Sequence, residues 1–465
     1  MAAAAFPASE PRLVAAAERQ DARAVRELLA AGSSADARQP DGTTALHWAA
    51  HWNDVHMLRD LLDVGADPNA TNELGAAPLW LTALNASAKA GGLLLAAGAD
   101  PNASLPSGET VLMAAARTGS VELVQALLEA GADPDSQTHW RGQTALMWAA
   151  GEGHADSVAR LVRAGAEVDA RSNHGGTALL LAARRGDTAT ARALLEGGAD
   201  VDAGEPVLAT NARVDVDESQ TSGRTPLFIA SASIVATSGF EYGLVTKPSG
   251  HEELAIFLLA NGADPNRADS IGKTPLHAAA ETGKARLVEA LLTHGADPDA
   301  RLTAAPPPLQ GDFVAYTRYV GATPLWLAAA ARTPNPAIVR TLAAAGDPEL
   351  KADDGTTPLM AAVGMVQNEA RLAPEPDALE VVRILVGLDI DINATDNRGR
   401  TAMHGAARLA RNALIPVLVD RGGLVSVADL AGKTPLDVGT VARPLHPDTA
   451  ALLRSFGATS GTGGR

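Results

Sequence analysis

Two histidines near the start of the chain have the spacing of a metal-binding pair. His47 and His51 are four residues apart, so on a helix they would share one face and could chelate zinc, and His56 follows nearby. No third ligand at suitable spacing is evident. The sequence therefore predicts no metal ion and no other cofactor.

Other motifs that could carry chemistry are incomplete. The GKT triplets at 272–274 and 432–434 resemble the end of a phosphate-binding loop, but the glycine needed five positions earlier is replaced by Arg267 and Val427. The acidic stretch VDVDES at 214–219 lacks the spaced ligands and the glycine of a calcium loop. We therefore expect no catalysis, although carboxylates from separate segments could converge unseen in the sequence.

Composition excludes several further classes. The 465 residues contain no cysteine, which rules out disulfide scaffolds and cysteine nucleophiles. No apolar stretch reaches the length of about 18 residues that a spanning helix needs, so we expect no membrane insertion. The net charge of -16 would repel a phosphate backbone, so we expect no nucleic-acid partner. Arginine far outnumbers lysine, as in GC-rich genomes, which favours a bacterial source.

A repeated block organises the chain. Its form is Gly-x-Thr-[Pro/Ala]-Leu, followed by an Ala-rich helical stretch, a Leu/Val-rich one and a Gly-Ala-Asp turn. The third position of the block falls at Thr44, Ala77, Thr110, Thr144, Thr177, Thr225, Thr274, Thr323, Thr357, Thr401 and Thr434. Most steps are 33 or 34 residues. Each unit thus reads turn, helix, turn, helix.

One unit shows why the units must stack. The Thr44 hydroxyl can cap the first helix, and Gly65 stands where the second helix should end. Leu58, Leu61 and Leu62 give the second helix one apolar face. A single helix pair cannot bury that face, so neighbouring pairs must cover it in a solenoid.

The blocks resemble ankyrin repeats. The resemblance rests on TTALHWAA-type segments, on the AA-x-x-G-H segment at 149–154 and on LL-x-x-GAD, and it covers about residues 11–457. It is closest to bacterial ankyrin arrays. The resemblance implies an all-α fold, an ankyrin-repeat solenoid of about twelve helix pairs joined by β-hairpin-like turns. It also implies that His47, His277 and His404 are structural residues that hold the turns together.

The expected organisation follows the repeat. We expect a flexible N-terminal stub at 1–10, an N-terminal capping repeat at 11–40, regular repeats at 41–203, repeats with insertions at 204–430, a C-terminal capping repeat at 431–457 and a flexible tail at 458–465. Gly91 and Gly92 should weaken the second helix of their unit, with a hinge as a possible consequence.

Four insertions lie in the C-terminal half, at about 204–221, 232–250, 302–320 and 364–377. The first and third replace hairpin turns, whereas the second and fourth lengthen the turn between the two helices of a unit. Loops of this length are usually functional or disordered. The third carries Phe313, Tyr316 and Tyr319, which we interpret either as partner-binding or as packing across hairpins.

The tryptophans mark the candidate binding surface. All six fall in a hairpin turn or a first helix, which line the partner-binding concave groove in the family, and Trp and Arg are enriched at binding hot spots. The predicted partner-binding residues are Trp48, His51, Trp52, Trp140, Arg141, Trp148, Glu152, Arg184, Arg185, Tyr316, Tyr319 and Trp326. Trp52 and Trp140 should be exposed. An alternative for Trp80, Trp148 and Trp326 is that they fill space beside small alanines.

The predicted function is that of a monomeric, non-enzymatic module that binds another protein through its groove and inserted loops. One alternative is an enzyme or small-molecule-binding protein with a pocket closed by the insertions at 204–250 and 302–320. That pocket would place Tyr242, Tyr316 and Tyr319 near His251 and His277. A second alternative is a self-associating structural array, in which insertions pair between chains.

The compartment is left open by the start of the chain. MAAAAFPASEP lacks the charged region and the apolar core of an intact signal peptide, but it could remain after one is removed. The resemblance favours export to the periplasm of a bacterium, with the cytoplasm as the alternative.

Overall fold

The computed structural model describes residues 12–206, 222–232, 251–304, 319–365, 373–438 and 445–461. Within these ranges the chain is a succession of paired antiparallel helices joined by turns, and its contacts divide it into two units, one before and one after the boundary between Ala203 and Gly204. Regular strands are missing from these ranges, where isolated bridges such as the one between Arg38 and Thr44 close hairpin turns. No described helix is long and apolar enough to cross a membrane.

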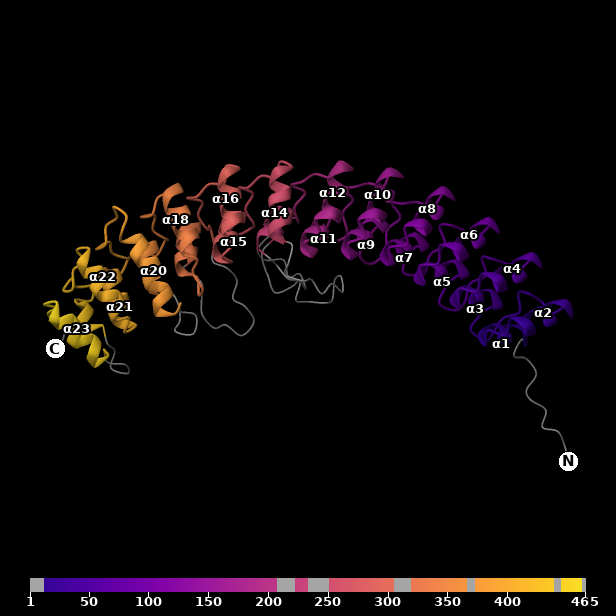
Figure 1. Ribbon diagram of the computed structural model, residues 1–465, viewed down its shortest axis with the longest axis horizontal. Coiled ribbons are helices and arrows are strands. Elements are labelled where there is room, and N and C mark those ends of the chain that lie inside the picture. The colour runs from indigo at the N-terminus through magenta and orange to yellow at the C-terminus, as the bar shows by residue number, and fades with distance from the viewer. Residues whose placement is uncertain are drawn as a thin grey trace, which may run out of the picture. The chain divides into compact units, whose positions relative to one another are not determined.

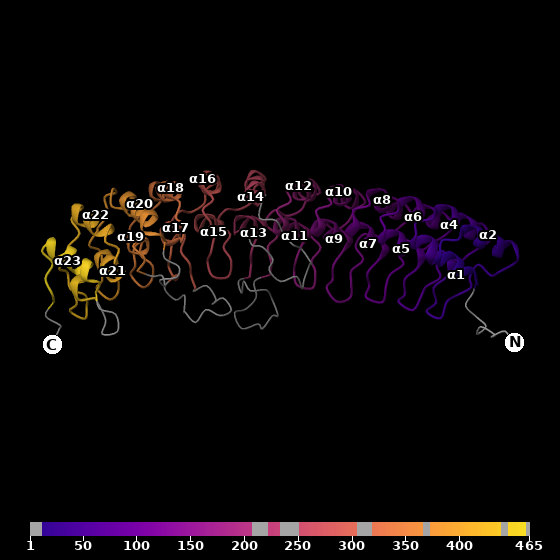
Figure 2. The same ribbon diagram turned by 60° about the horizontal axis from the view of Figure 1, so that its bottom comes forward.

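Unit 1 holds the six helix pairs α1 to α12, which are arranged in two rows (Figure 1). The first helices are α1 (Arg12–Glu18), α3 (Ala45–His51), α5 (Pro78–Leu84), α7 (Val111–Thr118), α9 (Ala145–Glu152) and α11 (Ala178–Arg185). The second helices are α2 (Ala22–Ala30), α4 (Val55–Asp63), α6 (Ala88–Ala96), α8 (Val121–Glu129), α10 (Ala155–Arg163) and α12 (Thr188–Glu196). The hairpin turns that connect successive pairs extend beyond the row of first helices (Figure 2).

The repeated threonine begins most of the first helices, as predicted. The Oγ1 of Thr144 accepts the backbone N–H of Met147 at 3.3 Å, and Thr177 does the same for Leu180. Such N-caps satisfy backbone donors that have no partner inside the helix. Just after α4, Gly65 has a positive φ of 88°. Glycine adopts this left-handed conformation without a steric penalty, so it can end the helix.

The core of unit 1 lies between the two rows. Ala49 and Ala50 of α3 and Leu58 and Leu61 of α4 have no exposed surface, which confirms the predicted apolar face of the second helix. Each pair packs against the pair before and after it, so stability comes from the interfaces between repeats.

A ladder of side-chain hydrogen bonds joins successive repeats at the turn after each second helix. Asn69 Oδ1 accepts the backbone N–H of Asp100 at 2.7 Å, and Asn69 Nδ2 donates to the carbonyl of Gly98 at 2.9 Å. Asn102 repeats both bonds one unit later with Asp133 and Gly131. The turn asparagines therefore fix the spacing of neighbouring pairs.

The paired glycines of α6 differ in their surroundings. The helix runs unbroken through both. Gly91 is buried, and an added Cβ would clash with Leu123 Cδ1 of α8, a side chain with no exposed surface. Around Gly92 the same Cβ would meet no atom within 4 Å. Gly91 thus permits a close approach of α6 to α8, whereas Gly92 only weakens the helix.

The two alanine substitutions should therefore have opposite effects. Gly92→Ala should raise the free energy of unfolding by about 0.5–1 kcal/mol, since alanine has the higher helix propensity. Gly91→Ala should lower it by about 1–3 kcal/mol, because the extra methyl overpacks a filled core. Urea denaturation of the two single variants measures both changes. If both substitutions change the free energy of unfolding in the same direction, the close packing of α6 on α8 is not the reason for glycine at position 91.

Unit 2 continues the helix pairs with longer connections. The first helices are α13 (Pro226–Ala232), α15 (Pro275–Glu281), α17 (Pro324–Ala330), α19 (Pro358–Ala362) and α21 (Ala402–Arg408). The second helices are α14 (His251–Ala260), α16 (Ala285–Thr293), α18 (Pro336–Ala345), α20 (Glu375–Leu385) and α22 (Leu414–Asp420). The unit ends with the 3-10 turn η3 (Pro435–Asp437) and α23 (Pro447–Ser455). The last pair therefore begins with a single 3-10 turn, where Asp437 accepts the backbone N–H of Thr434 at 3.1 Å.

The predicted insertions fall largely outside the described residues, which omit 207–221, 233–250, 305–318 and 366–372. Their described edges pack into unit 2. Leu302 is buried beside Trp326, and Tyr319 packs edge-to-face on Trp326 with ring centroids 5.3 Å apart. The Trp326 indole Nε1 donates to Thr356 Oγ1 at 3.3 Å.

Candidate functional site

The tryptophans of unit 1 lie on the first helices and hairpin turns at different depths. Trp140 is 85% exposed and Trp52 is 40% exposed, as predicted for both. Trp48 and Trp148 are half-buried, whereas Trp80 is buried. The space-filling interpretation is therefore confirmed for Trp80 but does not describe Trp148, which keeps part of its surface open.

Trp48, His51 and Trp52 form one aromatic cluster on α3. The Trp48 and Trp52 rings are stacked with centroids 6.2 Å apart, and the His51 ring meets Trp52 edge-on at 4.6 Å. Trp52 Nε1 donates to the carbonyl of Glu18, and Trp48 Nε1 donates to Gln39 Oε1, each at 3.2 Å. Both indoles are held in one orientation while Trp52 remains open to solvent.

Trp140 stands at the tip of the hairpin turn before α9. The backbone around it is fixed from both neighbouring turns. His139 N–H donates to the carbonyl of Ser107 at 2.9 Å, and Asn173 Nδ2 donates to the carbonyl of Trp140 at 3.0 Å. Arg141, which follows it, is half-buried, and its carbonyl accepts the N–H of Asn173 at 2.8 Å. The turn thus presents a large apolar side chain from a braced backbone.

Trp148 pairs with an arginine that the sequence prediction missed. The guanidinium carbon of Arg117 lies 5.0 Å from the centroid of the Trp148 ring, the geometry of a cation–π contact. Arg117 follows the alanine pair of α7, the same register that led to the prediction of Arg184 on α11. The repeat register therefore contained the signal, but the contact itself joins residues 31 positions apart in sequence and needed the structure.

The charged residues of α9 and α11 form the next part of this surface. Arg185 donates from Nη1 to the carbonyl of Gly151 at 3.2 Å and approaches Glu152 at 4.0 Å. Arg184, Arg185 and Glu152 are half-buried. An ion pair this exposed contributes at most about 1 kcal/mol to stability, so Arg185 and Glu152 can exchange partners at little cost.

The three histidines of the repeat motif are structural, as the resemblance implied. The Nδ1 of His277 accepts the backbone N–H of Thr274 at 3.2 Å, and its Nε2 lies 3.2 Å from the carbonyl of Ala322 in the next repeat. His47 accepts the backbone N–H of Thr44, and its Nε2 contacts the carbonyl of Ala76 in the next repeat. His404 makes the same two contacts with Thr401 and with Lys433. Burial lowers the pKa of His277 to about 4 and lowers the pKa of His47 and His404 as well.

These bonds also exclude His47 as a zinc ligand beside His51 and His56. Both of its ring nitrogens are engaged by the hairpin, whereas His51 meets the Trp52 ring edge-on. The described ranges contain no group of three or more His, Asp or Glu side chains that could hold a metal ion.

Two predicted partner-binding residues of unit 2 belong to its core instead. Trp326 has no exposed surface, and Tyr319 is half-buried against it. Their aromatic faces are used by each other, so we remove Trp326 from the binding surface and assign Tyr319 a packing role. Tyr316 lies outside the described residues.

The residues proposed for a closed pocket are only partly described. Tyr242 lies outside the described residues. His251 is buried at the start of α14, and His277 is used by its hairpin. The described part of the chain therefore gives neither histidine an accessible ring for catalysis.

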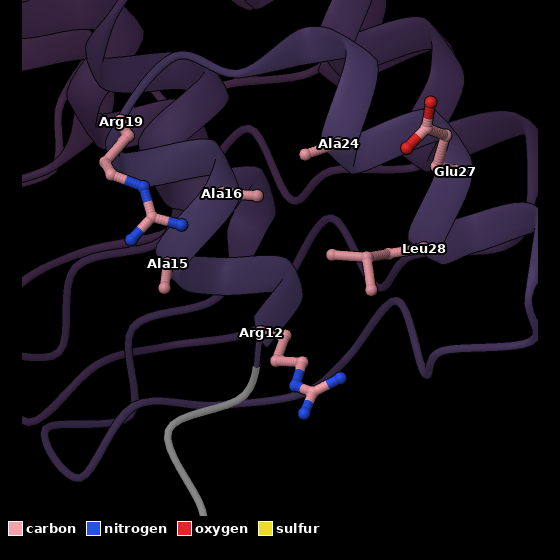
Figure 3. A pocket seen from close by; sticks show the side chains of 7 residues that line it. All are labelled: Arg12, Ala15, Ala16, Arg19, Ala24, Glu27 and Leu28. Atoms are coloured by element: carbon pink, nitrogen blue, oxygen red, sulfur yellow. The ribbon is translucent and has the colours of Figure 1, made fainter.

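A hollow of about 490 Å³ lies on α1 and α2 at the start of unit 1 (Figure 3). It is lined by Arg12, Ala15, Ala16, Arg19, Ala24, Glu27 and Leu28. In the next pair, Met57 and Leu61 stand where Ala24 and Leu28 stand here, and both are buried. The hollow is thus the face that a preceding pair covers elsewhere in the stack.

The known proteins that match these repeats are much longer chains. Neurogenic locus notch homolog protein 1 of Homo sapiens and of Mus musculus are each 34% identical over 228 residues, which are 48% of this chain and 8% of theirs. Inversin of Danio rerio is 34% identical over 84 residues, 18% of this chain and 7% of that protein. The matched stretch is less than a tenth of each relative.

Two family models match more than half of the chain. A model of three ankyrin repeats matches residues 13–104, 60–138, 79–172, 112–205 and 244–305, and a single-repeat model matches residues 354–397. Repeats of this kind are generally protein–protein interaction modules without enzymatic activity. The helix pairs, their threonine caps and their hairpin histidines thus have one common explanation: the chain belongs to the ankyrin-repeat family.

Proposed function

We propose that the chain binds a partner protein through the first-helix surface of unit 1. We define this surface as the exposed parts of α3, α5, α7, α9 and α11 together with the hairpin turns that precede them. It would serve as the concave groove of the family. The inserted segments, which lie mostly outside the described residues, would add contacts, and the chain would act as a monomer without catalysis.

The observation that carries this proposal is the rigid display of exposed tryptophan. Trp52 is held by its stacked neighbour Trp48 and by the carbonyl of Glu18, yet it is 40% exposed. Trp140 is 85% exposed on a turn that is hydrogen-bonded on both sides. Large aromatic side chains that are already ordered lose little entropy on binding, which is why such residues become hot spots.

The test compares capture of partners by the wild-type chain and by a Trp52→Ala, Trp140→Ala variant. Proteins from a lysate of the source organism are retained on each immobilised chain and quantified by mass spectrometry. We expect a partner that the wild type retains to be lost from the variant, with each hot-spot tryptophan contributing about 2 kcal/mol, roughly thirtyfold in affinity.

A matched control distinguishes binding at this surface from non-specific hydrophobic binding. Val64 and Leu424 are both 54% exposed and lie in turns that follow second helices. A Val64→Ala, Leu424→Ala variant should retain the partner. If the tryptophan variant captures the same proteins as the wild type, or if the control loses them equally, the first-helix surface of unit 1 is not the binding site.

We further propose a bacterial, exported protein, with the cytoplasm as the alternative. The excess of arginine over lysine supports the bacterial source. Fractionation of source cells, followed by immunodetection of the chain, would separate the two compartments.

A further inference from the structure

Charge is unevenly distributed over the last three repeats of unit 1. The hairpin-and-first-helix segments are 104–118, 137–152 and 171–186, and they carry five arginines and two glutamates. The second-helix segments are 119–136, 153–170 and 187–203, and they carry three arginines and eleven carboxylates. In a chain of net charge -16, the first-helix surface of these repeats is therefore locally positive.

One arginine of this surface packs on an aromatic side chain. Arg117 packs on the ring of Trp148 and forms no ion pair within the described residues. Its guanidinium is positioned by the cation–π contact, so its N–H groups keep their capacity to bind an anion. Trp148 Nε1 is buried and has no hydrogen-bond partner in this part of the structure, so the indole makes its contacts through its ring.

Arg185 of this surface is only weakly neutralised within the described residues. Arg185 reaches its nearest carboxylate, Glu152, at 4.0 Å, and both side chains are more than a third exposed. Arg184 precedes it on the same helix end, and Arg141 follows the exposed Trp140. Cationic groups beside exposed indole surface are complementary to a segment that carries both carboxylates and an apolar side chain.

Resting on the proposed function, we propose that the first-helix surface around α7, α9 and α11 binds an acidic segment of the partner protein. Carboxylates of that segment would pair with Arg117 and Arg185, and an apolar side chain would lie against Trp140 and Trp148. A nucleic acid is the less favoured occupant, because the second-helix segments of the same repeats carry the large carboxylate excess, which repels a phosphate backbone.

The test uses a display library of random twelve-residue peptides selected on the full-length chain. Peptides retained by the wild type should be enriched in Asp and Glu about threefold over the input library. The leading peptide should bind about tenfold more weakly to an Arg117→Gln, Arg185→Gln variant, and its affinity should fall as the salt concentration rises. The matched control is Arg160→Gln, Arg163→Gln, which removes two exposed arginines from α10 and should leave binding unchanged.

Each alternative result has a defined meaning. Selected peptides without acidic enrichment, or enrichment that persists in the Arg117→Gln, Arg185→Gln variant, would overturn the acidic-partner inference. If the selected peptides in either of these cases fail to bind the Trp52→Ala, Trp140→Ala variant, the proposed function stands without the acidic-partner inference. If no selected peptide depends on either set of residues, both fail. A single-stranded DNA or RNA 20-mer that binds in an Arg117-dependent manner, measured by fluorescence anisotropy, would replace the peptide with a nucleic acid.

Discussion

Replacing Trp326 by alanine should lower the free energy of unfolding of unit 2 by about 3–5 kcal/mol, the usual cost of removing a large buried aromatic side chain. The indole has no exposed surface and fills the space between Leu302, Tyr319 and Ala361. Its loss would also leave the hydroxyl of Thr356 without the indole donor. Hydrogen–deuterium exchange of peptides that cover α17 and α19 would measure the change as faster exchange in the variant.

Trp140→Ala is the matched control for this substitution. The same side chain is removed, but at a position that is 85% exposed, so the free energy of unfolding should change by no more than about 0.5 kcal/mol. Equal destabilisation by the two variants would contradict the assignment of Trp326 to the core and of Trp140 to the surface.

Acidification should destabilise the folded chain through its hairpin histidines. His277 has a pKa of about 4 in the folded state because burial disfavours the charged ring, against 6.5 for an unperturbed histidine. The unfolded state therefore binds the proton more readily, so stability is full above about pH 6.5 and is lost as the pH falls toward 4. For His277 alone the loss amounts to about 3 kcal/mol. The pKa of His47 and of His404 is lowered in the same direction.

The contribution of His277 can be isolated by a variant that the chain itself suggests. Met113, Met147 and Met360 occupy the same position in other repeats and are buried, so His277→Met should fold. Hydrogen exchange of α15 and α17 is compared for both proteins between pH 7.5 and pH 4.5, after correction for intrinsic exchange rates. The wild type should lose stability over this interval more steeply than the variant. Identical pH dependence would mean that His277 is not held neutral by the fold.

The repeat pattern was sufficient to predict the helix pairs because their causes are local. Thr144 begins α9 and Gly65 closes the α4 pair through backbone contacts within a few residues, which sequence spacing reports directly. The exposure of Trp52 and Trp140 was predictable for a similar reason, since both occupy fixed register positions of the repeat.

Features that depend on contacts between repeats were less accessible from the sequence. Trp326 was predicted to bind a partner, but the edges of an insertion, Leu302 and Tyr319, cover it. Arg117 was missed because its significance depends on the Trp148 ring of the next repeat. The reduction of the last pair to a 3-10 turn likewise has no signal in the Gly-x-Thr-Pro-Leu block, which is intact there.

The hydrogen bonds of the turn asparagines also constrain any modification of their side chains. Asn69, Asn102 and Asn393 each begin an Asn-Ala-Ser/Thr tripeptide, the acceptor sequence for N-linked sugars, and so does Asn85. In all four the amide nitrogen already donates to a carbonyl of a neighbouring repeat, at 2.7–3.1 Å. An asparagine amide has two N–H groups and each of these bonds uses one, so a sugar on that nitrogen would leave a single N–H to keep the contact with the neighbouring repeat. The folded stack therefore restricts the orientation of these four amides, because the remaining N–H must stay directed at the neighbouring carbonyl.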